Sequence, residues 1–364
     1  MKRIYKHIAF AFAITLISSN LYGEHSVRRS LDDQVKSLLE KLDQITVVNA
    51  HGEESVETGS AIPDVGGRNW FDSIDLLFWK SKVSGTKFAY SNSRFSVNQP
   101  IQGRTKECEF DWNAGIRVGI GRNFNHDQWS VNGEFTYFKD GGCSRLIGGE
   151  TSAIIPIRGP FSQPVHMAKS SIRNKFANLD VNLYRHYFIS SALALKPTIG
   201  LKNSWINIKQ IVKYNDGDNL EFNTAETTDR SKFWGIGPKA GIDTTWFLNS
   251  GFHIYGLVST SLLYSYFEVE QFSKLTPTEN FDFLMKEKKH RFIPNIQFNL
   301  GLGYSRFIRQ KRNYLEFRLG YETLYYFSAN QMLQLREFNG TFRFDNMSED
   351  ISMYGVTFQA KLFF

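Results

Sequence analysis

The sequence predicts an all-β protein, namely an antiparallel transmembrane β-barrel of about ten strands that follows a short N-terminal helix. From residue 69 onward, apolar and polar residues alternate with a period of two. Short connections between these runs alternate with long ones, and the last run ends on Phe364 at the chain terminus. A mean hydropathy of −0.34 fits such a barrel, because only every second residue faces lipid.

The first 23 residues have the pattern of a secretory signal peptide. Lys2, Arg3 and Lys6 precede an apolar run over residues 8–18, and a cleavage site follows Gly23. Removing these three cations lowers the formal net charge of +7 to +4. The remaining Lys and Arg residues are dispersed along the chain, so nucleic-acid binding is not predicted.

Residues 24–45 are predicted to form a short amphipathic helix, and residues 46–68 a polar linker to the barrel at 69–364. The apolar positions of the helix follow one another at steps of 4, 3, 4 and 3: Leu31, Val35, Leu38, Leu42 and Ile45. Two interpretations stay open. The helix packs on its own barrel, or it self-associates as a coiled coil and makes the protein a homo-oligomer.

Ten strands are predicted, near residues 70–82, 109–122, 128–140, 170–187, 192–213, 231–247, 252–273, 289–308, 313–329 and 350–364. Their connections alternate between about four residues and about fifteen or more, as periplasmic turns and extracellular loops do. A soluble sandwich shows the same period-two pattern, but this alternation of loop lengths favours the membrane barrel. The segment TKFAYSNSRFSV could add one hairpin, which would give twelve strands.

The final strand carries a second indication of an outer-membrane location. Its apolar face ends the chain and resembles the sorting signal that the barrel assembly machinery reads; it consists of Tyr354, Val356, Phe358, Leu362 and Phe364. Aromatic residues near predicted strand ends suit the two headgroup layers: Trp70, Trp112, Trp129, Trp205, Trp234, Trp246 and Tyr304.

Several phrases together resemble the Legionella-type major outer membrane protein family, which also occurs in chlamydia-like bacteria. They are FDSIDLLFWKSKVSGTKFAY, FDWNAGIRVGIGRNFNHDQWSVNGEFTYF, KFWGIGPKAGIDTTWFLNSGFHIYGLVSTSLLYSYF and LEFRLGYETLYY. The resemblance spans about residues 70–364. It implies a pore-forming barrel in the outer membrane of a Gram-negative bacterium, often with an N-terminal coiled-coil segment. It implies no catalytic residues.

The only two cysteines lie symmetrically about the predicted turn at 123–127. A hairpin there would bring Cys108 and Cys143 side by side, and an exported protein permits a disulfide. We therefore predict this bond at the outer rim, with two free thiols as the alternative. The glycine-rich stretches GIGPKAG and GIRVGIG lack the spacing of a nucleotide loop and are interpreted as barrel strands.

The polar faces of the strands predict the function. The charged residues expected to face the lumen are Asp75, Asp111, Arg117, Glu134, Asp180, Lys196, Lys202, Lys239, Asp243, Glu316, Arg318, Glu322 and Lys361. This mixture of signs predicts a porin with weak selectivity for small polar solutes or ions, without cofactor, metal or enzymatic activity. A lumen of ten strands is narrow, however, so a non-conducting structural or adhesive barrel is the alternative. Interlocked salt bridges would favour that alternative. The expected partners are outer-membrane lipid, the assembly machinery and small polar solutes.

Overall fold

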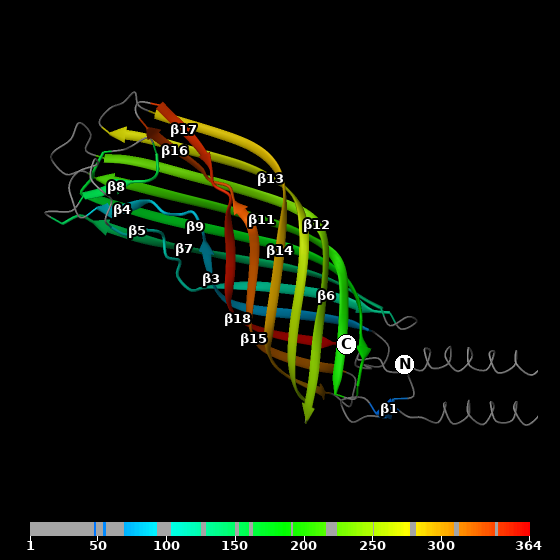
Figure 1. Ribbon diagram of the computed structural model, residues 1–364. Coiled ribbons are helices and arrows are strands. Elements are labelled where there is room, and N and C mark those ends of the chain that lie inside the picture. The colour runs from blue at the N-terminus through cyan, green and yellow to red at the C-terminus, as the bar shows by residue number, and fades with distance from the viewer. Residues whose placement is uncertain are drawn as a thin grey trace, which may run out of the picture.

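The computed structural model describes residues 47–48, 54–55, 69–92, 103–124, 129–149, 153–159, 163–190, 192–215, 224–249, 251–276, 282–308, 313–338 and 341–364. These residues form a closed antiparallel barrel of ten strands (Figure 1). The predicted fold class and strand number are therefore confirmed. No helix within these ranges is long and apolar enough to cross a membrane. The predicted signal peptide and the helix at 24–45 lie outside the described residues.

The barrel strands follow one another around the wall in chain order. They are β3 (Trp70–Val83), β6 (Asn113–Asn123), β7 (Trp129–Ile147), β9 (Met167–Arg185), β11 (Leu193–Asn215), β12 (Thr224–Asn249), β13 (Phe252–Thr276), β14 (Asp282–Ile308), β15 (Asn313–Asn330) and β18 (Glu349–Phe363). Each pairs with its neighbour, β9 pairs directly with β11, and β18 pairs with β3 to close the ring.

The shorter strands lie outside this ring. The segment that could have raised the strand number to twelve contains β4 (Ala89–Asn92), which pairs with β5 (Thr105–Lys106) and β8 (Ala153–Pro156) in a separate sheet. That possibility was therefore wrong. β16 (Leu333–Phe338) pairs with β17 (Thr341–Asn346), and β10 (Tyr187–Phe188) extends the edge of β11. In the predicted linker, β1 (Val47–Val48) pairs with β2 (Glu54–Ser55).

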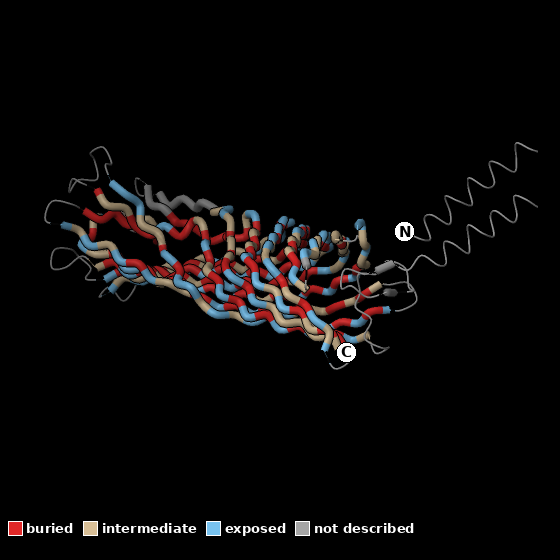
Figure 2. Tube along the Cα trace, turned by 90° about the horizontal axis from the view of Figure 1, so that it is seen from below, coloured by how far each residue is buried: buried red, intermediate tan, exposed pale blue. Residues whose placement is uncertain are grey.

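The outward faces of the strands carry an apolar band of membrane thickness. Along β12, the outward side chains from Trp234 to Trp246 are apolar apart from Thr244, and β14 repeats this from Phe292 to Tyr304. Each stretch advances twelve residues, or about 40 Å of strand, and a tilt of about 45° turns that into about 28 Å of height. Figure 2 shows exposed and buried residues alternating along the strands. The outward face of β18 belongs to this band and carries Tyr354, Val356, Phe358 and Leu362 of the predicted assembly signal, while Phe364 follows the strand.

Tight turns and long connections lie at opposite ends of the barrel. At one end, β12 and β13 are joined through Gly251, whose φ of +86° suits glycine. At the other end, β3 is joined to β6 and β7 to β9 by much longer segments. The long-loop end is the extracellular one in outer-membrane barrels. Beyond Trp234, β12 extends for another ten residues toward that end, so the wall continues well above the membrane.

Candidate functional site: a filled lumen

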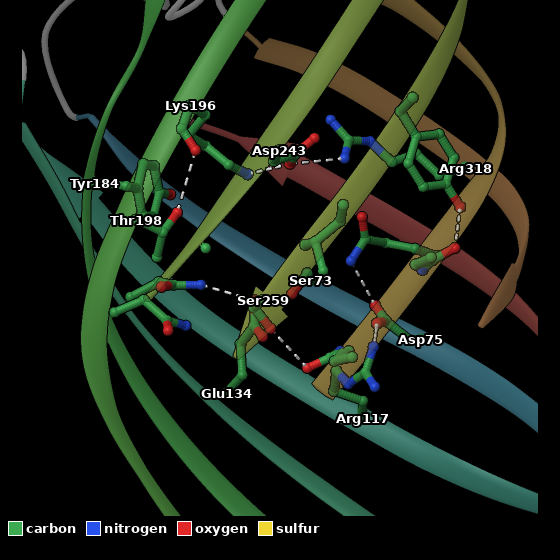
Figure 3. Close-up of a pocket in the computed structure, with 18 of the residues that line it drawn as sticks. Ser73, Asp75, Arg117, Glu134, Tyr184, Lys196, Thr198, Asp243, Ser259 and Arg318 are labelled. Atoms are coloured by element: carbon green, nitrogen blue, oxygen red, sulfur yellow. Dashed lines mark hydrogen bonds and ion pairs between the residues drawn. The ribbon is translucent and has the colours of Figure 1, made fainter. Parts of the chain in front are cut away.

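A small polar cavity lies inside the membrane-spanning part of the barrel (Figure 3). Its volume is about 90 Å³, which is room for a few water molecules. The lining side chains come from strands all around the ring, because every second residue of each strand points inward. They are mostly charged or amide side chains, and they join in three linked groups.

Arg117 on β6 is the centre of the first group. Its guanidinium lies 3.1 Å from a carboxylate oxygen of Asp75 and 2.7 Å from one of Glu322. It also donates to the hydroxyl of Thr136 at 3.0 Å. Glu322 in turn accepts hydrogen bonds from Gln297 on β14 and Thr357 on β18. The group around Arg117 thus connects six neighbouring strands of the wall, from β14 through β18 and β3 to β7.

Asp243 on β12 is the centre of the second group. Lys196 approaches its carboxylate to 2.5 Å, and Arg318 on β15 approaches the same oxygen to 3.2 Å. Arg318 also donates to Glu316 at 2.7 Å, and His253 lies 3.1 Å from Glu316. Because β15 lies three strands away from β12 in the ring, Arg318 spans the lumen rather than following the wall.

Asp180 on β9 is the centre of the third group. The ammonium groups of Lys202 and Lys239 lie 3.5 Å and 3.4 Å from its two oxygens. Asn178 donates to the same carboxylate at 2.6 Å. Lys202 is fully buried, and this carboxylate is its ion-pair partner inside the barrel.

The structure brings together all but one of the charged residues that the sequence assigned to the lumen. Asp75, Arg117, Glu134, Lys196, Lys239, Asp243, Arg318 and Lys361 line the cavity, and Asp180, Lys202, Glu316 and Glu322 pair with them. Asp111 lies apart: it precedes β6, is exposed and does not line the cavity. Without it, six cations face six carboxylates. The lumen is therefore electrically balanced.

Among the described residues, two of these twelve side chains form no ion pair: Glu134 on β7, which accepts a hydrogen bond from Asn132 at 2.8 Å, and Lys361 on β18. Within the described residues no carboxylate lies within 4.0 Å of its ammonium group, which instead lies 4.1 Å from the ring centre of Phe71 and 4.6 Å from that of Phe363. A cation held over aromatic faces is stabilised by their quadrupoles.

An aromatic layer crosses the lumen above the charged groups. It consists of five aromatic side chains and one aliphatic side chain, that of Ile206, all buried: Phe138, Phe176, Ile206, Phe233, Phe267 and Tyr326. The first five pair directly with one another across β7, β9, β11, β12 and β13. Tyr326 comes from β15, on the opposite wall from β9, and its ring centre lies 6.1 Å from that of Phe176. Side chains from facing walls thus touch, and an apolar constriction of this kind excludes water.

Loop segments fill the extracellular end above the aromatic layer. Arg158, in the segment after β8, is fully buried and pairs with Asp229 of β12 at 3.4 Å. It also donates to the backbone carbonyls of Lys87 and Leu333. Burial raises the pKa of Asp229 above its usual value, despite the nearby arginine. Segments from three long connections are therefore held inside the barrel wall.

Inward-facing polar residues of β11 complete this attachment. Gln210 donates to the carbonyl of Thr86 at 2.8 Å, and the hydroxyl of Tyr214 donates to the carbonyl of Phe88 at 2.7 Å. Neither the aromatic layer nor these loop contacts was predicted from the sequence. A signal for the layer exists in stretches such as EFTYF and SKFWG, where apolar residues occupy both faces of a strand.

The predicted disulfide between Cys108 and Cys143 is wrong. Both cysteines are free, with Cys108 buried and Cys143 exposed on the outward face of β7. Cys108 precedes β6 and lies inside the wall, where its thiol contacts the hydroxyl of Ser170 at 2.9 Å. Burial raises the pKa of this thiol to about 11, so it is protonated and unreactive at neutral pH.

Comparisons with known proteins agree with the architecture. A family model described as Legionella pneumophila major outer membrane protein precursor matches residues 65–364. No curated protein matches the chain.

Among solved structures, the chain is similar to the outer membrane protease OmpT from Escherichia coli, at 11% identity and a TM-score of 0.45 over 84% of this chain and 99% of that one. It is also similar to the toluene transporter TodX from Pseudomonas putida, at 7% identity and a TM-score of 0.28 over 82% of this chain and 89% of that one. It is similar as well to OprG from Pseudomonas aeruginosa, at 11% identity and a TM-score of 0.27 over 81% of this chain and 99% of that one. Similarities this low transfer no activity.

Proposed function

The chain belongs to the family of the Legionella pneumophila major outer membrane protein and forms a β-barrel of the Gram-negative outer membrane, and from this premise we propose that it is a surface barrel with a closed lumen. Its role is structural or adhesive: it anchors an extracellular extension of the wall and the loops on top of it. The proposal includes no catalytic activity.

One observation carries this proposal: the contact between Phe176 and Tyr326 from opposite walls. A channel for hydrated ions needs a continuous water path, and this contact interrupts it at the level where the apolar band ends. The charge network below the contact supports the same conclusion, because its ion pairs satisfy one another rather than facing open water.

Passive diffusion of small hydrophilic solutes or ions is the second candidate. The polar cavity lined by both signs of charge favours it. Conduction would require the aromatic layer and the loop segments around Arg158 to leave the lumen together. Because six cations balance six carboxylates, such a pore would show a reversal potential near zero in a salt gradient.

Single-channel recording in a planar bilayer separates these two functions. The refolded mature protein is compared with a general porin inserted into the same membrane, and folding is checked by heat-dependent mobility in gels. A folded barrel that stays silent across the voltage range is the expected result. Discrete steps from the purified protein would overturn the closed barrel and support the porin.

A deletion strain tests the role in the cell. Loss of a structural barrel is expected to increase sensitivity to detergent and chelator, while uptake of small hydrophilic solutes stays unchanged. A strain that takes up such solutes more slowly, yet resists detergent normally, would contradict the proposal.

A further inference from the structure

A group of cations lies on the outward face of the barrel at its extracellular end, five of them exposed and Lys209 half-buried. It is carried by β7, β9 and β11, and we define it as the basic belt: Lys139, Arg145, Lys169, Arg173, Lys175 and Lys209. All six side chains occupy outward-facing positions of their strands and do not point into the lumen. The belt is therefore separate from the charge network described above.

The strand register places like charges directly opposite one another. Lys139 pairs with Lys175, and Arg145 pairs with Lys169, across β7 and β9. Arg173 pairs with Lys209 across β9 and β11. Like charges directly opposite are destabilising in a sheet. This arrangement costs stability unless an anion from outside the chain compensates it.

Among the described residues, no carboxylate lies within 4.0 Å of a belt cation; Glu109, which lies beside β7, pairs with Lys106 instead. The outward positions of β7, β9 and β11 beside it hold no Asp or Glu. Elsewhere on this face, Lys213 of β11, which lies opposite Lys169, pairs with Glu226 at 2.9 Å, and Lys232 of β12 pairs with Glu268 at 3.0 Å. The same face of the barrel thus contains a self-neutralised part and an uncompensated part.

The belt begins one step above the outer aromatic girdle. The outward row Tyr137, Ala177, Trp205 and Trp234 runs across β7, β9, β11 and β12. The next outward row starts with Lys139 and Lys175, two residues or about 7 Å further along each strand. Tyr and Trp rings mark the headgroup level of a membrane. Lys139 and Lys175 therefore stand at the depth of the headgroups, on the extracellular side.

We propose that the basic belt binds the phosphate groups of a phosphorylated lipid in the outer leaflet. The occupant is a lipid because the belt is contiguous with the apolar band, which holds the acyl chains of the same molecule. It is phosphorylated because clustered Lys and Arg residues bind phosphate through charge-assisted hydrogen bonds. Such a lipid also relieves the repulsion within the belt.

The test uses the refolded full-length protein in neutral detergent micelles, with diphosphorylated lipid A as the probe. Binding is measured for the wild type and for K139Q/K175Q/K209Q, which removes three belt cations. The matched control K213Q/K232Q/K286Q also removes three outward lysines, each of which has a glutamate within 4.0 Å. Both variants have the same net charge, so they separate the belt from overall electrostatics.

The belt variant is expected to bind the probe on the order of a hundredfold more weakly, at about 1 kcal/mol per cation. The control variant should bind as the wild type does. If both variants lose the same affinity for the probe, the effect comes from net charge alone and the proposal is overturned. Undiminished binding of the same lipid without its phosphates would also overturn it. If inorganic phosphate alone displaces the lipid completely, the site takes free anions and the lipid assignment fails.

Discussion

Replacing Arg117 by methionine should destabilise the barrel strongly. The substitution keeps a long side chain but leaves Asp75 and Glu322, whose side chains are 1% and 0% exposed, without their cation. Removing one partner of a buried ion pair costs about 3–5 kcal/mol, because an uncompensated charge stays buried. The hydroxyl of Thr136 loses its donor as well. We therefore expect R117M to lower the free energy of unfolding by about 4 kcal/mol at neutral pH.

Urea unfolding in lipid vesicles, followed by tryptophan fluorescence, measures this loss. R122M is the matched control, since Arg122 is exposed and covers the ring of Trp70 on the outward face; it should cost less than about 1 kcal/mol. The variant D75N/R117M/E322Q removes both carboxylates as well and should recover most of the loss. If R117M and R122M unfold at the same urea concentration, the buried network is not stabilised as argued.

Three further predictions concern the extracellular half. A maleimide reagent should label exposed Cys143 within minutes and leave buried Cys108 unlabelled until unfolding; a gel shift on reduction would contradict the free thiols. Burial raises the pKa of Asp140 to about 6 from 3.8, so the folded state binds this proton more tightly. Its ionisation then costs stability above about pH 6, and the cost disappears as the pH falls below about 4. The gain in free energy of unfolding of D140N over the wild type should therefore be larger at pH 8 than at pH 4, by up to about 3 kcal/mol. If urea unfolding gives the same difference between the two proteins at both pH values, this prediction is refuted. R158M should leave Asp229 buried without its cation, and proteases should therefore cleave the extracellular loops faster than in the wild type. R158M/D229N also removes the buried carboxylate and should restore resistance to cleavage. Equal cleavage of the wild type and both variants would show that this ion pair does not hold the loops.

The barrel could be predicted from sequence because lipid imposes a simple rule on its strands. One face must be apolar over the whole membrane thickness, so a strand such as β15, predicted near 313–329, shows its limits through alternation alone. β14 begins at Asp282, seven residues before the predicted 289, because the strand continues beyond the apolar band. The charged residues of the lumen could be predicted in the same way, because they occupy the alternate, inward-facing positions of these strands. Asp111 was wrongly assigned to the lumen because β6 begins only at Asn113. The alternation of inward and outward side chains along a strand therefore does not apply to residue 111.

The closure of the lumen could not be predicted in this way. Phe176 and Tyr326 lie 150 residues apart, and nothing local indicates that they meet. The attachment of Arg158 to Asp229 likewise depends on how a long loop folds back. The disulfide prediction failed for a related reason. Equal spacing about a turn suggests proximity, but Cys143 points outward on β7 while Cys108 lies inside the wall.

The seam between β18 and β3 has a consequence for biogenesis. Trp70 and Phe364 exchange two backbone hydrogen bonds, of 3.1 Å and 2.9 Å, so the residue that follows β18 closes the ring with the first residue of β3. Until then, two strand edges stay unpaired, and Asp75 on β3 is separated from Gln359 on β18, which donates to it. Contacts of such long range form late in folding. A chain truncated by one strand would therefore keep open edges that prompt aggregation or degradation, which makes ring closure a checkpoint for complete chains.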